Sequence, residues 1–338
     1  MTRAHRWIVA VALAAACGHD DGARSGAEAE AEAESESESD SEVVGVAASA
    51  GASIRLPLDP GDEDTWCVEV RLDNDQPLDV HRIAATLSPQ SHHMIVYRSR
   101  ATVEVTAPFH CTPFVGAFTG ESVPVLITQV ARDEVVLPDR VAYAFEPHQM
   151  VRLEMHAINT TAEAADAVGA VTFEGLVGGV PDAYADLLFY GALDIDVPPG
   201  ETGSAGPAFL PVDAGTRVFA LTGHTHRFGT NVSIRKAESI LDEGAEVYAH
   251  DDWDWEEPPS DTFDPPLEFA EGGGFRIRCD YENTGTESVG VGESANDEMC
   301  FLWAYYWPSM GYQACVAYDS LSICCPDDPL CDVIADFF

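Results

Sequence analysis

The sequence has little positive charge. Its 338 residues contain 17 Lys plus Arg against 58 Asp plus Glu, a formal net charge of −41. A surface this negative repels nucleic acid and anionic lipid headgroups, so we expect neither as a partner. After the first segment there is also no apolar run of about 18 residues, which excludes a transmembrane helix there. Hydrophobic residues still make up 46% of the chain, enough for buried cores, and the length suits two domains of about 150 residues each.

The first residues have the pattern of an export signal. Arg3 and Arg6 precede a short apolar run ending at Leu13, which is followed by three alanines and Cys17. This order predicts a signal peptide over residues 1–17, and a cysteine after small residues resembles a bacterial lipoprotein box. Leu13 lies one place earlier than that pattern requires, so plain secretion is the alternative. We expect an exported protein, in the periplasm or anchored at the cell surface through Cys17. Residues 18–50 are expected to form an acidic, disordered linker.

The remaining eight cysteines support the expectation of export. An even number of cysteines in an exported chain predicts disulfides, here four. Cys67 and Cys111 lie in the first half, and the second half holds Cys279, Cys300, Cys315, Cys324, Cys325 and Cys331. This distribution fits two separately stapled domains, although spacing alone does not fix the pairing.

Short alternations of apolar and polar residues dominate after residue 51, and long helical periods are absent. Examples are the segments 67–72, 151–155, 217–221 and 275–278, each bounded by Gly, Pro, Asp or Asn nearby. Such segments predict strands, and many of them predict an all-β fold of two tandem jelly-roll or β-sandwich domains. We place the domains at residues 51–183 and 184–338 and expect a metal site on each.

Five of the 11 histidines fall into three short motifs, which are Ser91-His92-His93-Met94, Leu153-Glu154-Met155-His156 and His224-Thr225-His226. Two histidines separated by one residue on a strand project from one face, so His224 and His226 can hold one ion. Neighbouring residues point to opposite faces. His92 and His93 can therefore share an ion only if the strand begins or bulges there.

Each motif alone has an ordinary explanation. A lone histidine such as His156 is more often a surface or core residue than a ligand, and Met299 alone is more often core packing. The occurrence of all three histidine motifs in one exported β-protein outweighs these explanations. The other histidines are interpreted as non-ligands (His81, His110 and His148) or as part of an exposed loop (His250, with Trp253 and Trp255).

Copper is the metal that this set of residues favours. Imidazole binds zinc and copper alike, whereas a thioether such as that of Met299 selects copper, especially Cu(I). The sequence lacks the His-Glu-x-x-His of zinc proteases and the paired Cys-x-x-Cys of structural zinc sites. A blue-copper site requires a free cysteine, and these cysteines are expected to be paired.

The motifs, in this order, resemble those of the type II copper, ascorbate-dependent monooxygenases, which include peptidylglycine α-hydroxylating and dopamine β-monooxygenases. The similarity runs from about Trp66 to Pro308. It rests on residues 91–94, His156 with Asn159, residues 197–201, residues 224–226 with Gly229, and residues 297–300 followed by Tyr305 and Tyr306. Each piece is weak, but the ordered set is specific.

The resemblance implies two β-sandwich domains that face each other across a watery cleft, each with one copper ion. The copper that stores and passes an electron would be held by His92, His93 and His156. The catalytic copper, where O2 binds and a substrate C–H bond is broken, would be held by His224, His226 and Met299. The family reaction inserts one oxygen atom into that bond and reduces the other to water, with ascorbate as the reductant. The pairs Cys67–Cys111 and Cys279–Cys300 match family disulfides.

The substrate-binding residues depart from the family pattern. The peptide-hydroxylating members bind a C-terminal carboxylate through an arginine two residues before the His-Thr-His motif, where this chain has Thr222. An asparagine and a tyrosine after the ligand methionine also help, and Phe301 and Trp303 stand at those positions here. We therefore expect that peptides ending in glycine are not substrates. The two aromatic residues suit an apolar substrate and core packing equally well.

The favoured hypothesis is a monomeric enzyme that acts on a small organic substrate with O2. The alternative is a non-catalytic, exported lipoprotein that binds or sequesters copper and would keep the same ligands. Two different sites favour the enzyme, since storage requires only one kind of site. A surface adhesion module with incidental histidines is a third hypothesis, and it predicts no stoichiometric copper.

Overall fold

The computed structural model describes residues 47–114, 117–118, 120–318, 321–326, 328 and 330–331. All named elements in this part of the chain are β-strands, which confirms the predicted all-β fold. It contains no helix long and apolar enough to cross a membrane. The described residues belong to one compact unit. The predicted signal peptide with Cys17, and the linker up to residue 46, lie outside the described residues.

The strands of the first half form two sheets. One has the order β1–β10–β3–β8–β11, with β7 also paired to β3. Its strands are β1 (Ser49–Leu58), β3 (Leu78–Leu87), β7 (Arg132–Val136), β8 (Val141–Phe145), β10 (Ala165–Gly175) and β11 (Ala183–Tyr184). The other has the order β5–β2–β9–β4–β6. Its strands are β2 (Glu63–Arg71), β4 (Ser91–Ser99), β5 (Val105–His110), β6 (Ser122–Thr128) and β9 (Met150–Ile158).

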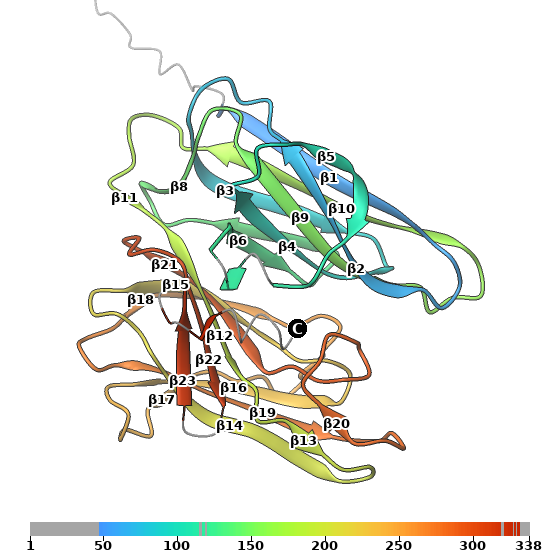
Figure 1. The fold of residues 1–338 in the computed structure, drawn as a ribbon. Coiled ribbons are helices and arrows are strands. Elements are labelled where there is room, and N and C mark those ends of the chain that lie inside the picture. Colours follow the sequence, from blue (N-terminus) through green and yellow to red (C-terminus); the bar gives the residue numbers. More distant parts are fainter. Residues whose placement is uncertain are drawn as a thin grey trace, which may run out of the picture. The chain divides into compact units, whose positions relative to one another are not determined.

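These two sheets pack face to face (Figure 1). A Cβ atom on Gly169 of β10 would lie 2.7 Å from the Met94 sulfur of β4 and 3.2 Å from the Met155 sulfur of β9. Because side chains alternate along a strand, Met155 on this inner face leaves its neighbours Glu154 and His156 on the outer face of the β4–β9 sheet.

The strands of the second half pair among themselves in the described part of the chain. A six-stranded sheet has the order β18–β15–β21–β12–β22–β23. Its strands are β12 (Asp186–Ala192), β15 (Arg217–His224), β18 (Ser260–Glu268), β21 (Phe301–Trp307), β22 (Gln313–Tyr318) and β23 (Leu321–Cys325). A four-stranded sheet, β14–β19–β16–β17, and a two-stranded one, β13–β20, complete it. Their strands are β13 (Asp196–Val197), β14 (Thr202–Pro211), β16 (Gly229–Ala237), β17 (Ala245–Tyr248), β19 (Gly274–Glu282) and β20 (Val289–Gly290).

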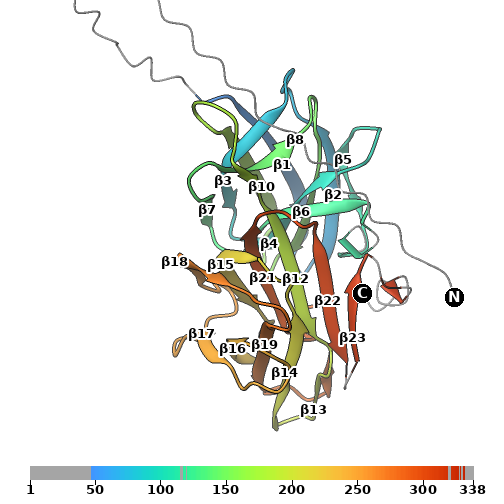
Figure 2. The ribbon, with the colours of Figure 1, turned by 90° about the vertical axis from the view of Figure 1, so that its left-hand side faces the viewer.

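Strands β12 and β21 are buried on both faces, and this fixes the position of the site. Their even-numbered residues, such as Leu188 and Leu302, join the core of the second half. Their odd-numbered residues, such as Phe189, Phe301 and Trp303, join a core that also contains residues of the first half. Figure 2 shows β12 and β21 running next to each other, with β4 and β6 of the first half above them. A sheet with apolar side chains on both faces must bury both.

The family resemblance implies a watery cleft between the two halves. Between these strands the structure has packed side chains instead. The aromatic residues of β12 and β21 pack against Phe114 of the first half, with ring centroids 5.2 Å apart for Phe189 and 6.3 Å for Trp303. Direct packing removes the apolar surfaces of these rings from water, which is favourable.

Strand pairing also bears on the expected domain limits. β11 still pairs with β8 of the first half, whereas β12 pairs with β21 and β22. Pairing thus changes partners between Tyr184 and Asp186, next to the predicted boundary at residue 183. β1 begins at Ser49, two residues before the predicted start of the first domain.

Four disulfides occur among the described residues, as the cysteine count predicts. Two of them, Cys67–Cys111 and Cys279–Cys300, are the pairs that the family resemblance implies. The pairs that the sequence left open are Cys315–Cys324 and Cys325–Cys331. None of the described cysteines is left as a thiol that could bind copper.

Gly191 provides a test of the close packing between β12 and β21. A Cβ atom at this position would lie 2.1 Å from Phe301 Cδ1, so Gly191→Ala must displace the ring. We expect the free energy of unfolding to fall by about 1–3 kcal/mol, the usual cost of overpacking a core. Denaturant unfolding measures it. The control is Gly290→Ala, whose Cβ would meet only Ile195 O at 3.7 Å. Equal stability of the two variants would contradict the packing described.

Candidate metal centre

The first three histidines meet on the outer face of the β4–β9 sheet. His93 of β4 lies directly opposite His156 of β9 in the antiparallel register, so both side chains project from one face. The register passes from Ser91 to His93 and skips His92. This irregularity is a β-bulge. It meets the condition under which the adjacent His92 and His93 can project from one side of the strand.

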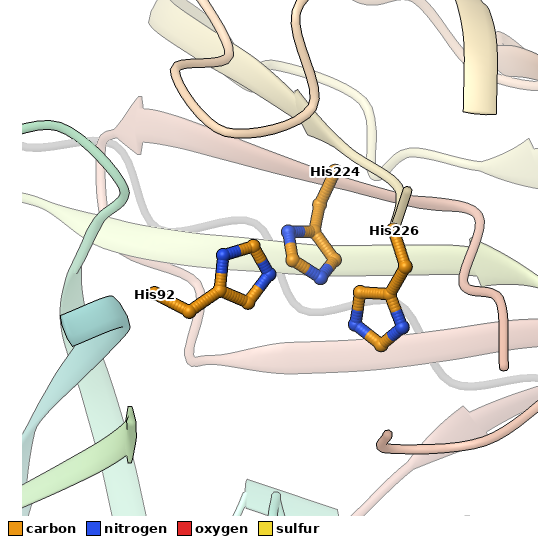
Figure 3. A group of neighbouring side chains, drawn as sticks. All are labelled: His92, His224 and His226. Carbon is orange, nitrogen blue, oxygen red and sulfur yellow. The ribbon is translucent and has the colours of Figure 1, made fainter. Parts of the chain in front are cut away.

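The other two histidines lie at the end of β15. His224 is the last residue of the strand and is paired with Phe301 of β21. His226 follows in the connection to β16, and the two ring centroids are 5.2 Å apart. Between them, the buried Thr225 accepts a hydrogen bond from Trp253 Nε1 at 3.0 Å. Figure 3 shows the rings of His92, His224 and His226 pointing toward one another from both halves of the chain.

All five histidines form one cluster instead of two distant sites. The ring centroids of His93 and His224, which belong to different halves, are 5.3 Å apart. Those of His156 and His226 are 6.4 Å apart. Two groups have their possible ligand atoms within 4.8 Å of one another: His92 with His93 and His156, and His92 with His224 and His226.

The ring nitrogens of this cluster fit a metal. Each histidine has one buried nitrogen without a hydrogen-bond partner: Nε2 of His92, Nδ1 of His93, Nδ1 of His156, Nε2 of His224 and Nε2 of His226. A buried polar atom without a partner costs free energy, so native structures rarely leave several of them together. Metal coordination would satisfy all five.

The opposite ring nitrogen is held by the protein in three of the five residues. His224 Nδ1 lies 2.5 Å from Gln129 Oε1, and His226 Nδ1 lies 3.3 Å from the carbonyl oxygen of Asp297. His156 Nε2 lies 3.4 Å from Glu63 Oε1. Metal-binding histidines are commonly oriented in this way by an acceptor on the far side of the ring.

Burial keeps four of the five imidazoles neutral. Burial, reinforced by the neighbouring imidazoles, holds the pKa of His92, His93 and His224 well below its usual range. Burial lowers the pKa of His226 to about 3. Neutral imidazole is the form that binds a metal. The hydrogen bond with His156 lowers the pKa of Glu63 to about 2, so this carboxylate is charged.

The sixth expected ligand, Met299, is fully buried and lies in the same core as Phe301. Its backbone is tied to His226 by the buried side chain of Glu298. Glu298 Oε2 accepts hydrogen bonds from the backbone nitrogens of His226 at 3.0 Å and Met299 at 3.4 Å, and Oε1 accepts one from Phe228 at 2.6 Å. Burial raises the pKa of Glu298 to about 7. The role of Met299 as a ligand stays a prediction.

Two further residues, Gln129 and Trp255, border the cluster, and no sequence motif marks their roles. Gln129 crosses from the first half to β15. Trp255 lies against His92 with ring centroids 5.2 Å apart, and both line a pocket of about 380 Å³. The interpretation of residues 250–255 as an exposed loop is wrong for the two tryptophans, which are half-buried.

The positions of the family's carboxylate-binding residues are closed. Thr222 is buried and donates a hydrogen bond to the carbonyl oxygen of Pro259 at 2.9 Å. Phe301 and Trp303 are fully buried and pack against Phe189, with ring centroids 4.6 and 4.0 Å apart. Of the two explanations left open for the aromatic residues, the structure supports core packing.

The histidines interpreted as non-ligands lie outside the cluster. His81 Nδ1 is 2.9 Å from the carbonyl oxygen of Val141. His110 and His148 are exposed beside Asp64 and Asp75.

Comparison with solved structures finds distant similarity to viral proteins. One is the major capsid protein P2 of bacteriophage PM2, with 8% identity over 77% of this chain and 99% of that chain and a TM-score of 0.33. Another is from Sulfolobus turreted icosahedral virus, with 8% identity over 77% and 57% of the two chains and a TM-score of 0.23. Broad bean stain virus gives 10% identity, coverage of 78% and 89%, and a TM-score of 0.29. Scores this low bear on neither fold nor function. No curated protein matches the sequence.

A protein family does match. Residues 208–323 fit the family model of the copper type II ascorbate-dependent monooxygenase, C-terminal domain. This range contains His224, His226 and Met299, whereas the three histidines of β4 and β9 precede it. Residues 208–323 therefore match the C-terminal domain of the copper type II ascorbate-dependent monooxygenase family, which supports the family resemblance.

Proposed function

We propose that the protein is a copper-dependent monooxygenase that hydroxylates a C–H bond of a small organic substrate. One atom of O2 enters the bond and the other leaves as water, with two electrons from ascorbate or a similar reductant and two protons. The observation that carries this proposal is the buried cluster of five histidines, each with one ring nitrogen free for a metal.

The residues divide into two ligand sets. We assign the first copper to His92, His93 and His156, and the second to His224, His226 and Met299. A bound copper ion supplies one-electron redox chemistry between Cu(I) and Cu(II), and a thioether ligand favours the reduced state. The alternative, copper storage without catalysis, requires no second kind of site.

Gln129 sets the tautomer of His224. Its amide nitrogen donates to the carbonyl oxygen of Gly223 at 3.1 Å and to Thr222 Oγ1 at 3.3 Å. A carbonyl oxygen can only accept, so the amide is fixed with Oε1 toward His224. His224 must then carry its proton on Nδ1, which leaves the lone pair of Nε2 directed at the metal position.

Glu63 and Glu298 support the other ligands. The carboxylate of Glu63 accepts a hydrogen bond from His156 Nε2, which leaves Nδ1 of that ring for a metal. It also accepts a hydrogen bond from the backbone nitrogen of Ala295 at 2.8 Å. Glu298 holds the backbones of His226 and Met299 at one carboxylate oxygen. These contacts keep the ligands in place before a metal binds.

Substrate access and cellular location are also part of the proposal. The pocket lined by His92, Gln129 and Trp255 leads to the cluster and suits a small molecule. The buried Thr222 leaves no cationic group there for a peptide carboxylate, so we do not expect peptides ending in glycine as substrates.

Four disulfides suit an oxidising compartment, which agrees with the export proposed from the sequence.

Copper content tests the proposal. We expect two copper ions per chain in the purified protein, about one in His156→Ala and a weakened second ion in Met299→Ala. His110→Ala, an exposed histidine outside the cluster, is the control and should keep both ions. Elemental analysis of the dialysed proteins gives the ratio. A folded parent without stoichiometric copper would overturn the proposal. A parent that binds two ions but consumes no O2 with ascorbate across a substrate screen would favour storage.

The role of Gln129 gives a second prediction. Gln129→Ala removes the acceptor of the His224 proton, and loss of such a partner typically lowers metal affinity by about 10–100-fold. We expect this loss for the second copper only. Gln129→Glu keeps an oxygen acceptor and should recover part of the affinity. Titration against a competing chelator measures both ions, with Gln149→Ala, a half-buried glutamine outside the cluster, as the control. Unchanged affinity in Gln129→Ala would exclude this role.

A further inference from the structure

We infer that the pocket bordered by Glu63, Asp64 and Glu293 is the route by which Cu(II) reaches His156, with these carboxylates binding the ion on its way. The inference rests on the proposed function, which places the first copper at His156. Because side chains fill the space between β12, β21 and the first half of the chain, the ion needs an opening elsewhere.

The pocket lies where the two halves of the chain meet and has a volume of about 400 Å³. Glu63 and Asp64 come from the start of β2, and Glu293 comes from the connection between β20 and β21. No lysine or arginine lines the pocket, and none among the described residues forms an ion pair with these three carboxylates. The pocket therefore gathers negative charge without a cation of the protein to balance it.

Exposure to solvent falls from Asp64 to His156. The side chain of Asp64 is 51% exposed, that of Glu63 is 21% exposed, and that of His156, which also lines the pocket, is 1% exposed. Glu63 Oε1 lies 3.4 Å from His156 Nε2. The acidic groups thus form a series that begins in solvent and ends beside a predicted copper ligand.

Thr65 holds Glu293 near His156. It is paired with His156 in the antiparallel register of β2 and β9, so both side chains project from one face of the sheet. The Thr65 hydroxyl donates a hydrogen bond to Glu293 Oε1 at 2.8 Å. The other oxygen, Glu293 Oε2, is buried without a hydrogen-bond partner. Such an atom costs free energy, and a cation in the pocket would satisfy it.

The types of ligand in the pocket suit divalent copper. Among divalent first-row metals, copper binds nitrogen and oxygen ligands most tightly, whereas Cu(I) prefers sulfur. The sulfur of Cys111, which also borders the pocket, is held in a disulfide. His156 Nδ1 is buried and lacks a partner, so it can take over an ion from the carboxylates. These groups favour Cu(II) as the form that enters.

The second pocket that reaches the histidines, at His92 and Trp255, has a different character. Its carboxylates, such as that of Glu256, are exposed, and apolar residues such as Leu87 and Ile158 also line it. Water and salt screen exposed charges strongly. That pocket suits an organic substrate, and the pocket at Glu293 suits a metal ion.

The kinetics of copper uptake test the route. Metal-free protein is mixed rapidly with Cu(II) held by a weak chelator, and the quenching of tryptophan fluorescence follows binding. The phase that His156→Ala abolishes reports the first copper. We expect Glu293→Gln to slow this phase by about three- to tenfold at low salt, part of the effect that acidic clefts have on association rates. The slowing should shrink at high salt.

The conditions and controls are set by the same groups. Burial raises the pKa of Glu293 to about 7, so the experiment is run at about pH 8, where this group is ionised. Glu256→Gln is the matched control, because it removes the same charge at the other pocket, and it should leave the phase unchanged. Asp64→Asn, at the exposed mouth, leaves the buried carboxylate intact and should also slow uptake. Thermal unfolding verifies that each metal-free variant is folded.

The outcomes separate the route from the proposed function. Equal slowing by Glu293→Gln and Glu256→Gln would overturn the route, because overall charge would then explain the effect. Uptake at the wild-type rate in Glu293→Gln and Asp64→Asn, with any loss of affinity due to faster release, would overturn it as well. Wild-type protein that binds no copper would overturn the proposed function itself, and the route with it.

Discussion

The candidate site depends on the burial of β12 and β21 on both faces. Their odd-numbered aromatic residues pack against the first half of the chain, and their even-numbered residues pack within the second. This holds the outer face of the β4–β9 sheet, with His93 and His156, against the end of β15, with His224 and His226. Neither half alone brings five histidines together. The apolar contact between the halves is thus what assembles the polar site, and Gln129 adds a hydrogen-bonded link across the same boundary.

The cluster is costly to the protein without a metal. Five buried ring nitrogens lack a partner, and each such atom typically costs about 1–3 kcal/mol. Burial also keeps most of these imidazoles neutral, so the site is ready to bind a cation without first losing protons. Metal binding would offset the cost and should stabilise the fold accordingly. The carboxylates of Glu63 and Glu298 contribute through the orientation of ligands. They are not members of the two histidine groups.

Much of this could be predicted from the sequence. Segments of alternating apolar and polar residues predicted the strands. The spacing in His224-Thr225-His226 and the pair His92-His93 predicted metal ligands. For the pair, the prediction required a bulge, and the register of β4 contains one. The even number of cysteines predicted the disulfides. These are local signals, in which residues close in sequence are constrained by strand geometry.

The rest could not be predicted because it depends on contacts between distant segments. No spacing links Gln129 to His224 or Trp255 to His92, since each pair is joined only by the packing of the two halves. The expected watery cleft came from the family resemblance. A signal against it was present in residues 187–190 and 301–306, which are apolar or aromatic at nearly every position and therefore predict a sheet buried on both faces.

The most direct test of the central claim is a crystal structure of the copper-loaded protein with anomalous diffraction recorded at the copper edge. The account predicts two anomalous peaks inside the five-histidine cluster, each within bonding distance of the free ring nitrogens. Peaks located only outside the cluster, or none in crystals grown with excess copper, would contradict it.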